Sequence, residues 1–157
     1  MRNLLLPLLL LACSPQAAEQ SPAAAAQQPS VHPVSGLQVI PLTITSLGKT
    51  HAFRVELART PQEQSRGLMF RTEMGANEGM LFPYDPPQVL SFWMKNTVLS
   101  LDLIFIGPDR RVINVAANAV PYSEATIRSD APGIAVLELN AGRARELNIV
   151  AGATVDW

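Results

Sequence analysis

The sequence predicts an α+β fold: a single compact β-rich domain with two short helices, in which the strands form a meander or barrel-like sheet or a sandwich. Short apolar stretches rich in Val, Ile, Leu and Phe recur along residues 37–157, and turns containing Gly, Pro or Asn separate them. Residues with helix-capping side chains occur near residues 60 and 140. About 120 residues have a globular composition, which is enough for one core.

The domain is predicted to begin with two strands and a helix. Residues 37–45 are β-rich, and a turn around Gly48 follows them. Residues 51–58 alternate between apolar and polar side chains, the pattern of a half-buried strand. The sequence Thr-Pro-Gln-Glu at 60–63 is a capping box with proline at the first helical position, and Gly67 should end this short helix.

The middle of the chain is predicted to hold a strand followed by a hairpin. Residues 80–84 read as a strand, and the Asp-Pro-Pro sequence at 85–87 should turn the chain. Residues 90–95 and 101–106 read as two further strands, and residues 96–100 join them with a loop length that is common in hairpins.

This predicted hairpin carries a polar group of residues between two apolar runs, namely Trp93, Lys95, Asn96, Thr97 and Asp102. Burying such side chains is costly unless they find partners. Lys95 and Asp102 lie near the connection, so they should be neighbours across it. Two interpretations remain open: a Lys-Asp pair that stabilises the hairpin, or a site that uses the charge of one of the chain's two lysines.

The C-terminal third is predicted to add strands at 111–116, 133–139 and 153–157. A polar loop at 120–131 lies between the first two of them, and a short helix at 141–147 follows the second. These elements complete the meander.

Three charged residues outside the hairpin are candidates for a site. Arg66 and Arg71 lie on either side of an apolar cluster, where an arginine can form a bidentate pair with an internal carboxylate or bind an anionic ligand. Glu138 lies between two leucines of a predicted strand. It is either an inward carboxylate partner for an arginine or a surface residue.

The N-terminus predicts export. A short basic start and an apolar run make residues 1–12 a signal peptide, because the run is too short to span a bilayer. The sequence Leu10-Leu11-Ala12-Cys13 is similar to a bacterial lipobox, in which Cys13 becomes the lipidated N-terminus; the alternative is an ordinary signal peptide cleaved a few residues later. Lipid at Cys13 would hold the protein on a membrane. Ser14 after the cysteine favours the outer membrane, facing the periplasm.

Residues 13–36 are predicted to be the lipidated N-terminus and a disordered tether, because Ala, Pro, Gln and Ser dominate them without apolar periodicity. His32 lies in this segment and is expected to be solvated. His51 begins a strand and has no second His or Cys nearby that would complete a zinc site.

Composition excludes several classes of protein. The formal net charge of −1 and the charged fraction of 16% leave no basic surplus of the kind that marks nucleic-acid-binding proteins. One cysteine cannot form an intramolecular disulfide. No sequence motif predicts a cofactor or a metal, and the sequence does not indicate the oligomeric state.

Four motifs resemble the bacterial and archaeal family called domain of unknown function 192. They are Gly67-Leu68-Met69-Phe70-Arg71; Gly79-Met80-Leu81-Phe82; Phe92-Trp93-Met94-Lys95-Asn96-Thr97 with Leu101-Asp102; and Val136-Leu137-Glu138-Leu139 before Ala141-Gly142. One departure is Ser100, where the family often has proline. The resemblance covers the chain from about residue 37 and implies a compact β-rich α+β fold and frequent export, but no established activity.

The favoured functional hypothesis is a non-enzymatic binding module on a lipid tether. Its ligand would be anionic or polyhydroxylated, such as an envelope saccharide or peptide, in a shallow polar groove. The groove is predicted to be lined by Arg66, Arg71, Trp93, Lys95, Asn96, Thr97 and Asp102.

Two alternatives stay open. One is a hydrolase or transferase in which Asp102 or Glu138 acts as base and Lys95 as its electrostatic partner, although no nucleophile and base form a recognisable motif. The other is a soft-metal site for Cu(I), because thioethers suit this ion and several methionines share the half of the domain that contains Trp93. These methionines are Met69, Met74, Met80 and Met94.

Overall fold

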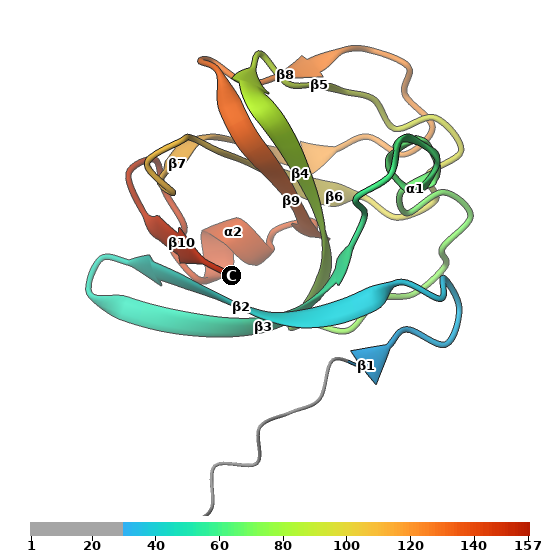
Figure 1. The fold of residues 1–157 in the computed structure, drawn as a ribbon, viewed down its shortest axis with the longest axis horizontal. Coiled ribbons are helices and arrows are strands. Elements are labelled where there is room, and N and C mark those ends of the chain that lie inside the picture. Colours follow the sequence, from blue (N-terminus) through green and yellow to red (C-terminus); the bar gives the residue numbers. More distant parts are fainter. Residues whose placement is uncertain (1–29) are drawn as a thin grey trace, which may run out of the picture.

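The structure is a computed structural model that describes residues 30–157 (Figure 1). Eight strands form one open, strongly curved sheet, and two short strands pair separately. The elements are β1 (Ser30–Val31), β2 (Gln38–Ser46), β3 (Lys49–Leu57), α1 (Pro61–Arg66), β4 (Glu78–Gln88), β5 (Ser91–Phe92), β6 (Leu101–Ile106), β7 (Val112–Ala119), β8 (Ile127–Arg128), β9 (Gly133–Asn140), α2 (Arg143–Glu146) and β10 (Thr154–Asp156).

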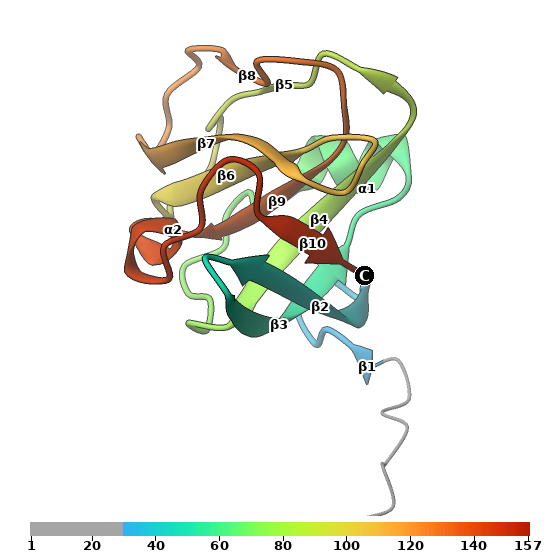
Figure 2. The ribbon, with the colours of Figure 1, turned by 90° about the vertical axis from the view of Figure 1, so that its left-hand side faces the viewer.

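The main sheet has the order β1-β2-β3-β4-β9-β6-β7, and β10 pairs with β2. Neighbouring strands are antiparallel except β3 and β4, which are parallel and are connected through α1. The two helices lie on opposite sides of the curled sheet (Figures 1 and 2). The prediction of a β-rich α+β domain with two short helices is therefore confirmed.

One edge of β2 is shared by two partners. Ser30 and Val31 of β1 pair with Val39 and Gln38, whereas β10 pairs with residues 43–45. The opposite edge of β2 pairs with β3 along nearly its whole length. Residues 30 and 31, which lie before the predicted domain boundary near residue 37, thus take part in the main sheet.

The core has two clusters, one on each face of the central strands β6 and β9. In β9, Ala135, Leu137 and Leu139 belong to the first cluster, whereas Val136 belongs to the second. Side chains alternate across a strand, so Glu138 points to the same face as Val136. This alternation directs a carboxylate toward the second cluster.

The capping box at the start of α1 is formed as predicted. The Thr60 hydroxyl accepts from the Glu63 backbone N–H at 3.2 Å, and the Glu63 carboxylate accepts from the Thr60 N–H at 2.8 Å. Hydrogen bonds from the Thr60 and Arg59 backbone amides lower the pKa of Glu63. Gly67 ends the helix with a φ of 46°.

The predicted hairpin of residues 90–95 with 101–106 was wrong. The short strand β5 pairs with β8, and β6 lies between β7 and β9. Both edges of β6 are therefore occupied, and residues 93–100 leave β5 as a turn that the loop before β8 covers. Backbone hydrogen bonds join the two segments, from Met94 N–H to Ser123 O at 2.8 Å and from Tyr122 N–H to Thr97 O at 3.1 Å.

The turn predicted at residues 85–87 was also wrong, because these residues continue β4. The pairing of β4 with β9 shifts register between Pro83 and Gln88, and the Asp85-Pro86 peptide is cis. A β-bulge-type irregularity of this kind accommodates prolines that cannot donate to the ladder.

The predicted signal peptide, the lipidation site Cys13 and most of the predicted tether lie outside the described residues. Among residues 30–157, no helix has the length and apolar character needed to cross a bilayer.

Candidate functional site

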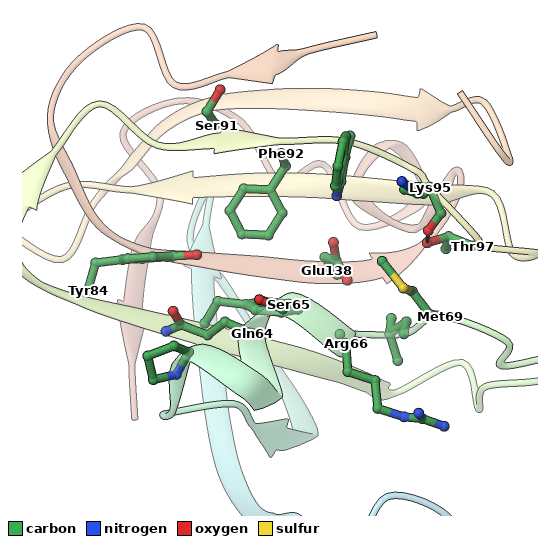
Figure 3. Close-up of a pocket in the computed structure, with 15 residues that line it drawn as sticks. Gln64, Ser65, Arg66, Met69, Tyr84, Ser91, Phe92, Lys95, Thr97 and Glu138 are labelled. Carbon is green, nitrogen blue, oxygen red and sulfur yellow. Dashed lines mark hydrogen bonds between the residues drawn. The ribbon is translucent and has the colours of Figure 1, made fainter. Parts of the chain in front are cut away.

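A pocket of about 340 Å³ lies between α1, β4, β9 and the segment that includes and follows β5. Figure 3 shows α1 with Gln64, Ser65 and Arg66 on one side of it and Phe92 with Lys95 on the other. Glu138 lies between these two sides. The pocket thus has a carboxyl group at its base and walls from segments far apart in the chain.

Glu138 reaches the pocket from a strongly apolar environment. It lies in register with Met80 of β4 and Leu103 of β6, both fully buried, and it is itself only 5% exposed. No hydrogen bond or ion pair joins its carboxyl group to any residue in the described range 30–157. Burial raises the pKa of Glu138 to about 8, because water is removed from the charged form. At neutral pH the group is therefore mainly a neutral acid that can donate a hydrogen bond.

An aromatic wall covers the pocket beside Glu138. Phe92 makes edge-on contacts with Phe82 at 5.2 Å and with Tyr84 at 6.3 Å between ring centroids. Burial, with a smaller contribution from the charge of Glu138, raises the pKa of Tyr84 to about 12. The Tyr84 hydroxyl therefore keeps its proton over the physiological range.

Lys95 and Arg66 are the basic side chains of the pocket. The Lys95 ammonium lies 5.0 Å from the centroid of the Trp93 ring, a cation–π arrangement, and Trp93 is 48% exposed. In the part of the chain that the structure describes, neither Lys95 nor Arg66 forms an ion pair with a carboxylate. Both charges are therefore available to a ligand.

Some of the remaining polar groups of the pocket already form hydrogen bonds within the protein. The Gln64 amide nitrogen donates to the carbonyl oxygens of Pro83 at 2.8 Å and Ala58 at 3.3 Å, which fixes this side chain and leaves its oxygen as an acceptor. The Thr97 hydroxyl donates to the Lys95 carbonyl at 3.2 Å. The hydroxyls of Ser65 and Ser91 also line the pocket. These groups suit a ligand with several hydroxyl or carbonyl groups.

Part of the predicted site converges on this pocket. It is lined by Arg66, Trp93, Lys95 and Thr97. Asn96 lies in the same turn with a φ of 54°, but its amide points to the Met69 sulfur at 3.9 Å and it does not line the cavity.

Arg71 pairs with an internal carboxylate, which was one of the two roles that the sequence allowed. Its guanidinium forms a bidentate pair with Glu56, at 2.9 and 3.0 Å. Ser35 donates to the same carboxylate, and the Nε2 atom of His32 lies 3.6 Å from it. The expectation that His32 is solvated was wrong, because residues 32–35 fold back onto β3.

Asp102 is fully buried and forms no ion pair with Lys95. Its carboxylate accepts hydrogen bonds from the backbone N–H groups of Asn118 and Ala144, each at 2.9 Å. The prediction that Asp102 is a neighbour of Lys95 was wrong, because it assumed a hairpin that does not form. Asp102 instead joins the end of β7 to the first turn of α2.

Replacing Asp102 with alanine should lower the free energy of unfolding by about 3 kcal/mol, because two backbone donors lose a charged acceptor. Asp109→Ala is the matched control, since Asp109 is exposed and accepts a single backbone hydrogen bond, from Arg111 at 3.1 Å. Urea unfolding of both variants checks the expectation. Equal midpoints for the two variants would contradict it.

Sequence reasoning missed the aromatic wall and the position of α1 against it. Tyr84, Phe92 and Gln64 gave no signal, because they come from elements whose contact depends on the fold. Glu138 was among the predicted candidates, because it interrupts an apolar strand; it is buried as one interpretation expected, but it forms no ion pair with an arginine among residues 30–157. Among residues 30–157, no group of three His, Cys, Asp or Glu side chains is arranged to hold a metal ion.

Comparisons with known proteins give the following matches. The family described as DUF192, an uncharacterized ACR, matches residues 42–157. A protein of unknown function from Novosphingobium aromaticivorans DSM 12444, solved by crystallography, is 55% identical with a TM-score of 0.82, covering 87% of this chain and 98% of its own. A putative transcription regulator from Sinorhizobium meliloti 1021 is 39% identical with a TM-score of 0.75, covering 76% and 94%. No curated protein matches the chain.

Proposed function

This chain belongs to the domain of unknown function 192 family, whose members carry no assigned activity in their description, and we propose that it is a non-enzymatic binding module whose α1–β9 pocket takes an anionic or polyhydroxylated ligand. The envelope offers saccharides and peptides of this kind. The observation that carries the proposal is a buried Glu138 beside two basic side chains, none of which forms an ion pair within the described range 30–157.

The composition of the pocket supports a ligand with both polar and apolar surfaces. Trp93, Tyr84 and Phe92 provide ring faces and edges that suit the C–H faces of a sugar or an apolar side chain. Lys95 and Arg66 provide positive charge for an anionic group. A concave, largely apolar site with a few placed polar groups is typical of small-molecule binding.

A thermal-shift screen tests this proposal. The protein is residues 13–157 with Cys13→Ser, screened against envelope saccharides and peptides. A ligand at about a hundredfold excess over its Kd should raise the melting temperature by on the order of 10 °C, because it binds only the folded state. Lys95→Ala and Trp93→Ala should each weaken binding about tenfold or more.

Lys49→Ala is the control for that screen, because Lys49 is the chain's other lysine and is exposed at the start of β3. It should respond to ligand as the parent protein does. A ligand whose effect is equal in Lys95→Ala, Trp93→Ala and Lys49→Ala would bind elsewhere, and the proposed site would be wrong.

A second candidate is a hydrolase or transferase in which Glu138 works with Lys95. The raised pKa of Glu138 suits an acid or base near neutral pH. Glu138 is the carboxylate that lines the pocket, whereas Asp102 is occupied by backbone amides. Recovery of a bound ligand unchanged after long incubation favours the binding module. Turnover that Glu138→Gln abolishes favours the enzyme.

The soft-metal alternative has less support. Met80 and Met94 are fully buried in the second core cluster, and Met74 packs against that cluster. Met69 lines the pocket with no other methionine. The positions of these side chains favour a packing role, which is the common use of methionine.

We also propose that the protein is exported and held on a membrane by lipid at Cys13, on the outer membrane facing the periplasm. The lipobox-like sequence before Cys13 supports this. Metabolic labelling with a radioactive fatty acid should mark the wild-type protein and not Cys13→Ala. Label retained in that variant would contradict the anchor.

A further inference from the structure

The charges of the pocket depend on one proton. Three charged or titratable acid–base groups line it in addition to Tyr84, namely Arg66 on α1, Lys95 after β5 and Glu138 on β9. When Glu138 is neutral, the pocket carries two basic side chains and no negative charge. When Glu138 ionises, the pocket also carries a carboxylate, which opposes an anionic ligand.

The elements packed around Glu138 bring few groups that could take this proton. The strand β4 contributes Tyr84, whose pKa of about 12 keeps it protonated, and Met80. The strand β6 contributes the apolar Leu103, which pairs with Glu138 in the register of the sheet. The helix α1 and the segment after β5 contribute the basic side chains Arg66 and Lys95. The described part of the chain therefore offers Glu138 no carboxylate with which to share a proton.

A neutral Glu138 also has a donor that no acceptor among residues 30–157 engages. Glu138 lines the pocket, and no hydrogen bond joins its carboxyl group to any residue in the range 30–157. Water in the pocket can satisfy this donor, and an acceptor supplied by a ligand would take the place of that water. A carboxylate oxygen is the strongest acceptor available, and it also pairs with an ammonium or guanidinium.

We infer that the pocket takes a saccharide that bears a carboxylate, and that it binds this ligand together with a proton held on Glu138. The inference rests on the proposed binding function and adds its ligand class and its pH dependence. The ligand carboxylate accepts from the Glu138 O–H and pairs with Lys95, while the sugar ring lies against Trp93 (Figure 3).

The expected signature is a loss of affinity at alkaline pH. Burial raises the pKa of Glu138 to about 8, so the free protein is already protonated below that pH and Kd should be nearly constant there. Above it, Kd should rise about tenfold per pH unit, because ligand and proton binding are linked. The pH at which Kd begins to rise therefore reports the titration of Glu138.

The test compares N-acetylmuramic acid with N-acetylglucosamine, which differ by the carboxylate-bearing lactyl group. Kd is measured by NMR titration of residues 13–157 carrying Cys13→Ser, from about pH 6 to about pH 9.5. The acidic sugar should bind at least tenfold more tightly near pH 7, and this preference should fade above about pH 8. In Glu138→Gln, the Kd for the acidic sugar should no longer depend on pH; Glu124→Gln, at an exposed site, is the control.

The outcomes separate the inference from the proposed function. Equal, pH-independent binding of both sugars would overturn the inference and leave the binding module in place. A pH dependence that persists in Glu138→Gln would also overturn it. Failure of both sugars to bind at any pH would overturn it too, while the broader thermal-shift screen would decide whether the pocket binds another class of ligand.

Discussion

The wild-type free energy of unfolding is expected to fall between about pH 4.5 and pH 8, and replacing Glu138 with glutamine should abolish most of this fall. The unfolded chain releases the Glu138 proton near its ordinary pKa of 4.5, whereas the folded protein keeps it up to about 8. Between these values the unfolded state binds fewer protons, so stability falls as pH rises. The full loss is on the order of 4 kcal/mol.

Urea unfolding at several pH values measures this effect. The wild-type free energy of unfolding should decline through the window and level off above about pH 8, while Glu138→Gln should show a much flatter curve. Glu124→Gln, which replaces an exposed glutamate, should follow the wild type. Parallel curves for wild type and Glu138→Gln would mean that the Glu138 carboxyl group is hydrated in the folded protein.

The second large effect concerns the pair between Arg71 and Glu56. Arg71→Ala should lower the free energy of unfolding by about 3 to 5 kcal/mol, because it leaves a carboxylate that is only 5% exposed without its bidentate partner. Denaturant unfolding near pH 7 checks the value. The same change should loosen residues 32–35, whose His32 and Ser35 contact the same carboxylate.

Two variants control this experiment. Arg145→Ala removes an exposed arginine on α2 and should cost little. Arg71→Met combined with Glu56→Gln removes both charges and should cost less than Arg71→Ala alone, since no uncompensated buried charge remains. If the single and double variants lose the same stability, packing of the arginine stem and not the buried charge explains the effect.

Elements whose signals are local could be predicted from the sequence. The capping box of Thr60 and Glu63 depends on residues three apart, and β9 is marked by the apolar run at 134–137. The hairpin prediction failed because pairing is not local: β6 has β9 and β7 as partners, and β5 pairs with a strand more than thirty residues away along the chain. The loop length permitted a hairpin and did not require one.

The candidate site was predictable to a similar extent. Polar residues within an apolar stretch pointed to Trp93, Lys95 and Thr97, which line the pocket. The same reasoning included Asp102 and Arg71, because a buried polar residue that holds the fold together has the same sequence signal as one that meets a ligand. Only the positions of their partners, the amides near α2 and the Glu56 carboxylate, separate the two roles.

The shared edge of β2 has a consequence for self-association. Sheet edges with long rows of unpaired backbone groups add strands from other molecules and seed aggregation. On β2 this edge is covered at one end by β1 and at the other by β10, and the gap between them contains Pro41, which has no N–H to donate. A second copy of the chain therefore finds no continuous row of unpaired backbone groups at this edge of β2, so strand addition there is disfavoured.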